Sequence, residues 1–260
     1  VPAMRRALMQ RAAVRGELGD PGALEDAEQA VAASAAGAEW AEATCWHGMV
    51  LGLLGRVATA EGRFEAALRE QPTQYLGTYG LGCVRLDQGR AQEALARFDA
   101  ARATANARGD RQNDVLISLM RANALRALGR ADEAEAIARE AEVELVRSGL
   151  GFVWQARLAV GFSRLALGEP HRAGVPFTRA MVGGERARRM AVLGLAVVAD
   201  RTGQDPSRWL EAFDPSGLWQ SLAYEREAIH LLDRITAETL LPGVAALAAD
   251  RAGRLRARIG

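Results

Sequence analysis

Two stretches of the sequence decide the fold: residues 44–67, TCWHGMVLGLLGRVATAEGRFEAA, and residues 78–101, TYGLGCVRLDQGRAQEALARFDAA. Shifted by 34 residues, the first stretch matches the second at small residues, at a phenylalanine and at a glycine–arginine pair. The matching pairs include Thr44/Thr78, Gly48/Gly82, Gly55/Gly89, Arg56/Arg90, Ala60/Ala94, Arg63/Arg97, Phe64/Phe98, Ala66/Ala100 and Ala67/Ala101. Self-similarity at a fixed period of this length indicates a stacked repeat.

The order of these residues resembles the tetratricopeptide repeat (TPR), a hairpin of two helices. Gly48 and Ala60 are predicted to lie where the two helices of one hairpin cross, because only small side chains allow so close an approach. Gly55 is predicted to end the first helix in the left-handed conformation. Phe64 is expected to fill the gap between one hairpin and the next. Since no hairpin can bury its apolar face alone, neighbouring hairpins must stack.

The pattern extends in both directions along the chain. Residues 4–18 and 23–35 form a predicted first hairpin, and Gly89-Arg90-Ala91 recurs at a longer period as Gly129-Arg130-Ala131. In the following repeat the corresponding positions are Gly161, Gly168, Ala173, Phe177 and Ala180. We therefore predict an all-α fold, an α–α superhelix (TPR solenoid) with about five helix hairpins over residues 1–183. A degenerate hairpin and capping helices follow over residues 184–260, the last two helices at 218–240 and 244–259.

Composition limits the classes of partner. With 33 basic and 32 acidic residues the net charge is +1, so no strong field attracts nucleic acid or a membrane. The two cysteines make no disulfide framework, which favours a reducing compartment, and we expect a cytoplasmic protein. No apolar run of about 18 residues occurs, so no membrane span is expected. The first residue is not methionine, and a start within a longer chain stays open.

Little in the sequence points to catalysis. The three histidines, His47, His171 and His230, have no recognised metal-ligand spacing, and no metal or other cofactor is expected. Residues 161–163 lack the second glycine of a nucleophile elbow. Residues 183–186, GGER, fit an inter-repeat turn better than an anion site. The arginines at 251, 254, 256 and 258 fit the end of a helix better than a nucleic-acid tail. We expect no enzyme.

The resemblance to TPR proteins implies that the first helix of each hairpin lines a concave face. Residues three and four apart on those helices then form rows across the repeats. The rows are Cys45, Tyr79, Leu119, Leu158; Met49, Cys83, Asn123, Phe162; and Gly52, Leu86, Arg126, Leu165. Most members are apolar, so the rows predict a groove that holds a helix or a hydrophobic peptide.

Two functions remain open at this point. The first is a non-enzymatic scaffold that binds a protein or peptide in the apolar groove, with Tyr79 and Phe162 as aromatic anchors. The second is an effector-sensing module, for a small molecule or a peptide, within a larger bacterial transcriptional or signalling regulator. Filling of the groove by the chain's own terminal helices or by a second copy, as in a homo-oligomer, also stays open.

Overall fold

A computed structural model describes the backbone of residues 2–18, 20–215 and 222–259. Within these ranges the chain is helical and contains no strand, which confirms the predicted all-α class. Two compact units are present: residues 1–117 with 218–223 (unit 1), and residues 118–217 with 224–260 (unit 2). The predicted boundary after residue 183 was drawn from the repeat pattern, and it stays a prediction.

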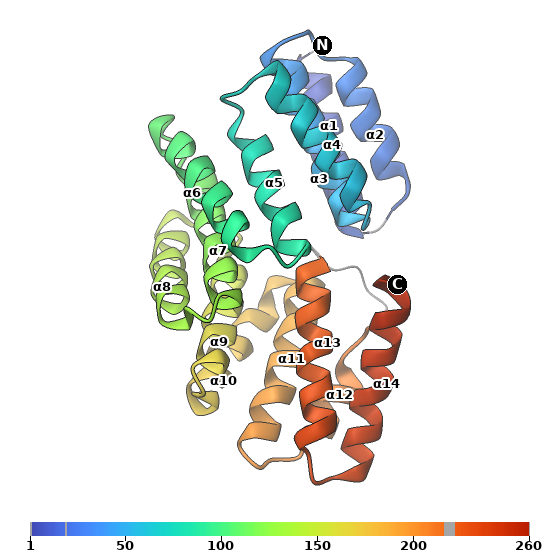
Figure 1. The fold of residues 1–260 in the computed structure, drawn as a ribbon, viewed down its shortest axis with the longest axis vertical. Helices are drawn as coiled ribbons and strands as arrows, with labels where there is room; N and C mark the ends of the chain where they lie inside the picture. Colours follow the sequence, from blue (N-terminus) through green and yellow to red (C-terminus); the bar gives the residue numbers. More distant parts are fainter. Residues whose placement is uncertain (1, 19, 216–221, 260) are drawn as a thin grey trace. The chain divides into compact units, whose positions relative to one another are not determined.

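Unit 1 is a stack of helix hairpins in which consecutive helices run antiparallel (Figure 1). Its helices are α1 (Pro2–Leu18), α2 (Gly22–Ala32), α3 (Ala38–Leu53), α4 (Val57–Glu70), α5 (Tyr75–Asp87), α6 (Ala91–Ala107) and the first residues of α7 (Arg111–Ala127). α2 ends three residues before the predicted end. α6 has 17 residues against 14 in α4, and α7 has 17 against 13 in α5, so both helices contribute to the longer period after the third hairpin.

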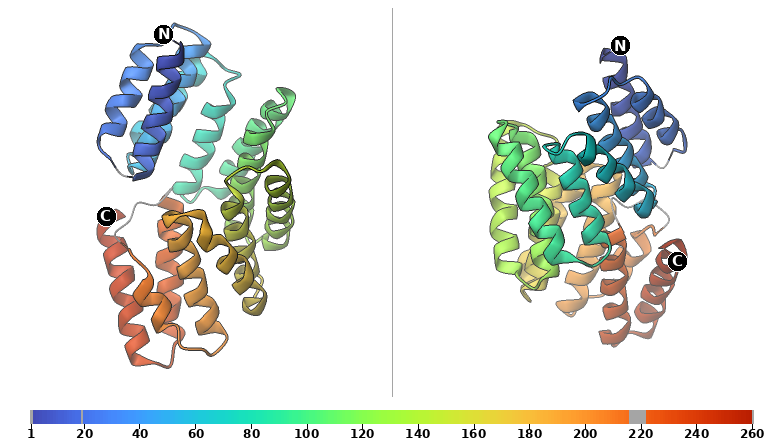
Figure 2. Two further views of the ribbon diagram at one scale, coloured as in Figure 1. Left: turned by 180° about the vertical axis from the view of Figure 1, so that it is seen from behind. Right: turned by 45° about the horizontal axis from the view of Figure 1, so that its top comes forward.

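Unit 2 continues the same arrangement and ends in a hairpin of two helices of 17 and 18 residues. Its elements are the rest of α7, α8 (Ala131–Ser148), α9 (Val153–Ala166), α10 (Pro170–Ala180), the short 3-10 helix η1 (Met181–Gly183), α11 (Glu185–Arg201), α12 (Ser207–Ala212), α13 (Leu222–Glu238) and α14 (Pro242–Ile259). Helices α11, α13 and α14 lie side by side in both Figure 1 and Figure 2. α14 begins at Pro242, two residues before the predicted start at Val244. Proline is tolerated in a first turn because the backbone N–H groups of that turn have no partner within the helix.

Glycine ends the first helix of the second and third hairpins, as predicted. Gly55 and Gly89 have φ of 76° and 77°, the left-handed region that other residues avoid. The next residue then folds back: the N–H of Arg56 donates to the carbonyl of Leu51 at 2.8 Å. This bond satisfies a carbonyl that the helix end would otherwise leave unpaired, as in a Schellman motif.

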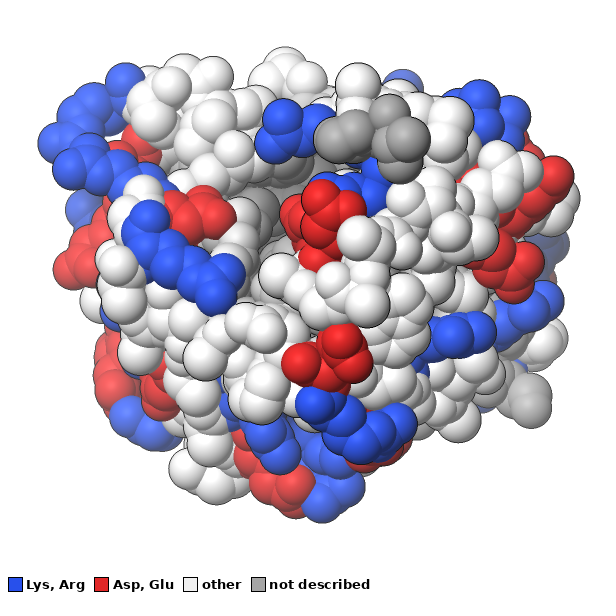
Figure 3. Space-filling view, turned by 90° about the horizontal axis from the view of Figure 1, so that it is seen from above, with Lys and Arg blue, Asp and Glu red and all other residues white. Residues whose placement is uncertain are grey.

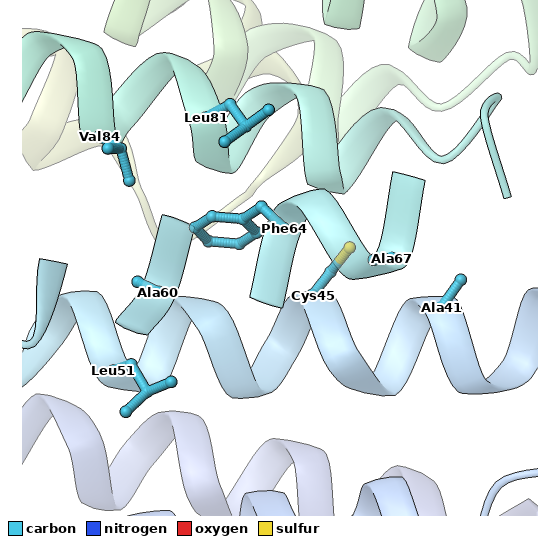
Figure 4. Close-up of a cluster of buried hydrophobic side chains, with 8 residues drawn as sticks. All are labelled: Ala41, Cys45, Leu51, Ala60, Phe64, Ala67, Leu81 and Val84. Carbon is cyan, nitrogen blue, oxygen red and sulfur yellow. The ribbon is translucent and has the colours of Figure 1, made fainter. Parts of the chain in front are cut away.

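In α4 and in α10, a phenylalanine of the second helix packs against glycines of two first helices. In unit 1, a methyl group added at Gly48 of α3 would lie 2.7 Å from the ring of Phe64, and one added at Gly80 of α5 would lie 2.3 Å from it. Figure 4 shows this ring of α4 among Leu81 and the other side chains of the core. The predicted filling of the gap between hairpins by Phe64 is therefore confirmed.

Unit 2 repeats this packing with Phe177 of α10. Its ring lies between Gly161 of α9 and Gly194 of α11, where added methyl groups would approach within 2.6 and 2.5 Å. Glycine is required at these positions because a larger side chain would push the helices apart. The alternation of ring and glycine sets the spacing of α3 and α5 and that of α9 and α11.

Candidate functional site

In unit 1 the predicted row residues fall on α3 and α5, at different depths. Cys45 is fully buried in the core, and Leu86 is 8% exposed. Met49, Tyr79 and Cys83 are half-buried. The ring of Tyr79 packs against Phe98, with the centroids 5.9 Å apart. Of this part of the row, Met49, Tyr79 and Cys83 keep surface that a ligand can reach.

Both thiols of the row are held in the protonated form. Burial raises the pKa of Cys45 to about 12, and the nearby Glu42 carboxylate adds to the effect. Burial also raises the pKa of Cys83 to about 12, with a further contribution from Asp87, while a hydrogen bond with Tyr79 acts in the opposite direction. Since the thiolate is the nucleophile, neither cysteine is activated for covalent chemistry at neutral pH.

In unit 2 the row residues of α7 and α9 form a layer with one charged member. Leu119, Leu158, Phe162 and Leu165 are each at most 6% exposed, and Asn123 is 7% exposed. Arg126 is half-buried, and its guanidinium lies 5.4 Å from the centroid of the Phe162 ring, a cation–π contact. The guanidinium Nη1 of Arg126 also points to Oδ1 of Asn123 at 3.5 Å. Amide and guanidinium thus lie together on the apolar layer.

The surroundings of Phe162 differ from the expected open anchor. The ring stands edge-on against Phe177, with centroids 4.9 Å apart, and only 3% of the residue is exposed. The guanidinium of Arg126 is thus more exposed than the ring that it contacts. Whether these row residues contact a ligand stays a prediction.

A set of arginines that the repeat pattern did not predict holds α5 and α9 between their neighbours. Nε of Arg164 donates to Glu135 of α8 at 2.8 Å, and its Nη1 donates to the carbonyl of Arg172 in α10 at 2.8 Å. Arg85 of α5 pairs in the same way with Glu61 of α4. A signal was present in the sequence, because Glu61 and Glu135 occupy equivalent positions of their repeats.

A second arginine of α9 makes the equivalent pair of contacts two turns away. Nε of Arg157 donates to Glu142 of α8 at 2.9 Å, and its Nη1 donates to the carbonyl of Arg179 in α10 at 2.9 Å. Both carboxylates and both carbonyls are therefore bound by one helix. α9, which carries Leu158 and Phe162, is fixed at two levels between α8 and α10.

The histidine and the glycine turn that the sequence also singled out have structural surroundings. Among the described residues no cluster of His, Cys, Asp or Glu has the makings of a metal site. His47 is 3% exposed, and burial lowers its pKa, an effect that the nearby Arg63 strengthens. Gly184, with φ of 97°, precedes the first residue of α11, and the neighbouring Gly183 packs against Trp154, which fits the predicted turn.

The C-terminal arginines are neutralised within the last two helices. Arg251 and Arg254 each form an ion pair with Asp250, and Arg256 forms one with Asp233. The side chain of the fourth, at position 258, lies outside the described residues. On the face drawn in Figure 3, basic and acidic side chains lie next to one another. No described helix has the length and apolar character needed to cross a membrane.

No protein-family pattern and no curated protein matches the sequence. Solved structures do match the fold. A Rap protein complexed with competence and sporulation factor aligns with a TM-score of 0.72 and 12% identity, over 98% of this chain and 74% of its own. A TPR protein of Thermus thermophilus aligns with a TM-score of 0.53 and 19% identity, over 83% of this chain and 99% of its own.

The chain has a tetratricopeptide-like repeat fold. A third structure matches this fold across nearly its whole length. It is the Rap conjugation gene regulator of the plasmid pLS20 in complex with the Phr* peptide, with a TM-score of 0.56 and 13% identity, over 99% of this chain and 96% of its own. Identities this low establish the tetratricopeptide-like fold alone, so function has to be argued from the site.

Proposed function

We propose that the chain is a binding module for a peptide, which it holds on the first-helix layer of unit 2. The observation that carries this proposal is the placement of Arg126 and Asn123 side by side on an otherwise apolar layer. One charged group and one amide above apolar side chains are what a small binding surface needs to orient a ligand.

The chemistry of the two side chains suggests what they would bind. A guanidinium presents five N–H donors in a planar fork, which suits a carboxylate. The amide of Asn123 offers both a donor and an acceptor, which matches the alternating groups of a peptide backbone. The contact of Arg126 with Phe162 restrains the guanidinium before binding, so less side-chain freedom is lost when the ligand arrives.

Solved structures with this fold support a peptide as the ligand class. The structure of the pLS20 regulator is that of its complex with a peptide, and it aligns with 99% of the present chain. We place the module in the cytoplasm, because its two thiols are free. We propose binding rather than catalysis, since neither thiol is activated and the described residues offer no metal cluster.

The test is selection of peptides from a random display library with free C-termini, followed by fluorescence polarisation. Arg126→Ala should weaken the selected peptides by about 10-fold or more, in line with the loss of a charge-assisted hydrogen bond. Arg139→Ala, at an exposed position of α8, is the matched control and should leave affinity unchanged. Selection of no peptide, or equal affinity for the two variants, would refute the proposal.

Unit 1 supplies a second proposed contact surface, made of the row residues Met49, Tyr79, Cys83 and Leu86 with the buried Cys45 beneath them. Tyr79 is its anchor, because a half-buried aromatic ring offers a large contact area at little cost in conformational entropy.

A second candidate function is a sensor within a larger regulator. It is favoured by the match of a Rap protein and of a Rap conjugation gene regulator along 98% and 99% of this chain. In that case peptide binding at Arg126 should change hydrogen exchange in helices that do not touch the peptide, such as α2 or α14. Protection confined to α7 and α9 would favour a simple scaffold.

A further inference from the structure

Three valines of unit 2 lie exposed near the C-terminal ends of the second helices α8 and α10. Val143 and Val146 of α8 are 68% and 58% exposed, and Val182 of η1 is 85% exposed. An isolated exposed valine is ordinary, but three near the C-terminal ends of two second helices leave a larger apolar area in contact with water. These three residues are termed the valine patch.

Two arginines of α9 bridge α8 and α10. Arg164 links Glu135 of α8 to the carbonyl of Arg172 in α10, and Arg157 links Glu142 to the carbonyl of Arg179. Residue numbers therefore rise in the same direction along α8 and α10.

The contacts of Arg157 place Glu142 of α8 and Arg179 of α10 at the same height along the two helices. Val146 follows Glu142 by four residues, and Val182 follows Arg179 by three. Helix α10 leads directly into η1, which carries Val182. The three valines thus share one end of the two parallel helices.

One acidic and one basic side chain of α8 lie on either side of the two α8 valines in the sequence. Glu140 and Arg147 of α8 are both exposed and stand seven residues apart, with Val143 and Val146 between them in sequence. Seven residues are two helical turns, about 10.5 Å along the axis. Neighbours on one helix are three or four residues apart, so Arg147 pairs within its helix with Glu144 and not with Glu140.

We propose that the valine patch binds a second copy of this chain, with the two α8 helices antiparallel about a two-fold axis. If the axis passes between Val143 and Glu144, Glu140 of each copy lies opposite Arg147 of the other. Two equivalent ion pairs then flank the packed valines, which is the self-complementarity that a two-fold interface requires.

The contact is small, so the dimer is expected to be weak. One helix and a short turn from each copy bury less than the roughly 1,200 Å² that stable interfaces reach. Association should therefore appear in sedimentation equilibrium as the concentration rises from about 10 µM to about 1 mM. This interface lies on second helices, so it is independent of the proposed peptide site on the first helices.

The test exchanges the two charges between copies. Glu140→Arg alone sets arginine opposite arginine, and Arg147→Glu alone sets glutamate opposite glutamate, so each variant should self-associate about tenfold more weakly or worse. An equimolar mixture of the two variants restores both ion pairs and should associate within about threefold of the unchanged protein. A structural change within a single molecule would not restore association when the two variants are mixed.

Val143→Ser should abolish association, because it removes the apolar centre of the interface. Val175→Ser is the matched control, since Val175 of α10 is 57% exposed and lies two turns before Val182. It should leave the dimer unchanged, and far-UV circular dichroism should show every variant folded. A monomer at all concentrations, or a mixture that associates as weakly as its components, would overturn the proposal.

Discussion

Replacing Gly80 by alanine should destabilise unit 1, although alanine is normally the better residue within a helix. A methyl group at Gly80 would lie 2.3, 2.4 and 2.5 Å from Cε1, Cζ and Cδ1 of the Phe64 ring. The ring has no room to retreat, because Gly48 meets it from the other helix, with an added methyl there at 2.7 Å. Overpacking of this kind costs about 1–3 kcal/mol, which exceeds the gain of about 0.5–1 kcal/mol from replacing a helical glycine.

Gly62→Ala is the matched control, because Gly62 lies within α4 and an added methyl there meets nothing within 4 Å. It should stabilise the protein by about 0.5–1 kcal/mol, the opposite sign. Both variants are compared by urea denaturation, followed by far-UV circular dichroism. In a Phe64→Leu background, Gly80→Ala should lose most of its cost, and this coupling identifies the ring as the cause. Equal effects of the two alanines in the unchanged background would refute the packing argument.

Three further predictions concern His47, the arginines and the binding face. Burial lowers the pKa of His47, so on acidification the unfolded chain takes up a proton before the folded chain does. The free energy of unfolding should therefore fall as the pH drops below about 6.5. In denaturation experiments, the free energy of unfolding of His47→Gln should not fall in this way between about pH 6.5 and 5. Arg164→Ala should cost about 1–3 kcal/mol in denaturation, against at most about 0.5 kcal/mol for Arg147→Ala, whose side chain is 71% exposed. The double variant Tyr79→Ala with Phe162→Ala should remain helical and lose at least about 2 kcal/mol of peptide binding by fluorescence polarisation, and unchanged affinity in a folded variant would place the site elsewhere.

The fold was accessible from sequence because its determinants are local and repeat. Gly48 recurs as Gly82 and Phe64 as Phe98, and the turn glycines recur with them, so a comparison at one fixed shift detects them. Gly80 escaped this comparison. It contacts the phenylalanine of the preceding hairpin, and the same shift sets it opposite Trp46, which carries no such signal.

The site was less accessible, because depth and side-chain direction depend on several helices at once. The spacing on α9 places Phe162 on the first-helix face, but it does not reveal that Arg126 of α7 covers the ring. The ion pair of Arg164 with Glu135 joins helices of two different hairpins. Because the period lengthens after the third hairpin, a comparison at one fixed shift does not align Glu135 with its equivalent Glu61.

The ring of Phe64 has a consequence for how the hairpins melt. It belongs to the packing of α4 on α3 and equally to the packing of α4 on α5, through the two glycines that face it. In a one-dimensional description of repeat arrays, the intrinsic stability of a hairpin and its coupling to the next are separate parameters. Here a single side chain contributes to both. Fraying of the hairpin α5–α6 therefore exposes the ring that holds α3 to α4, and the smallest cooperative unit spans at least two hairpins.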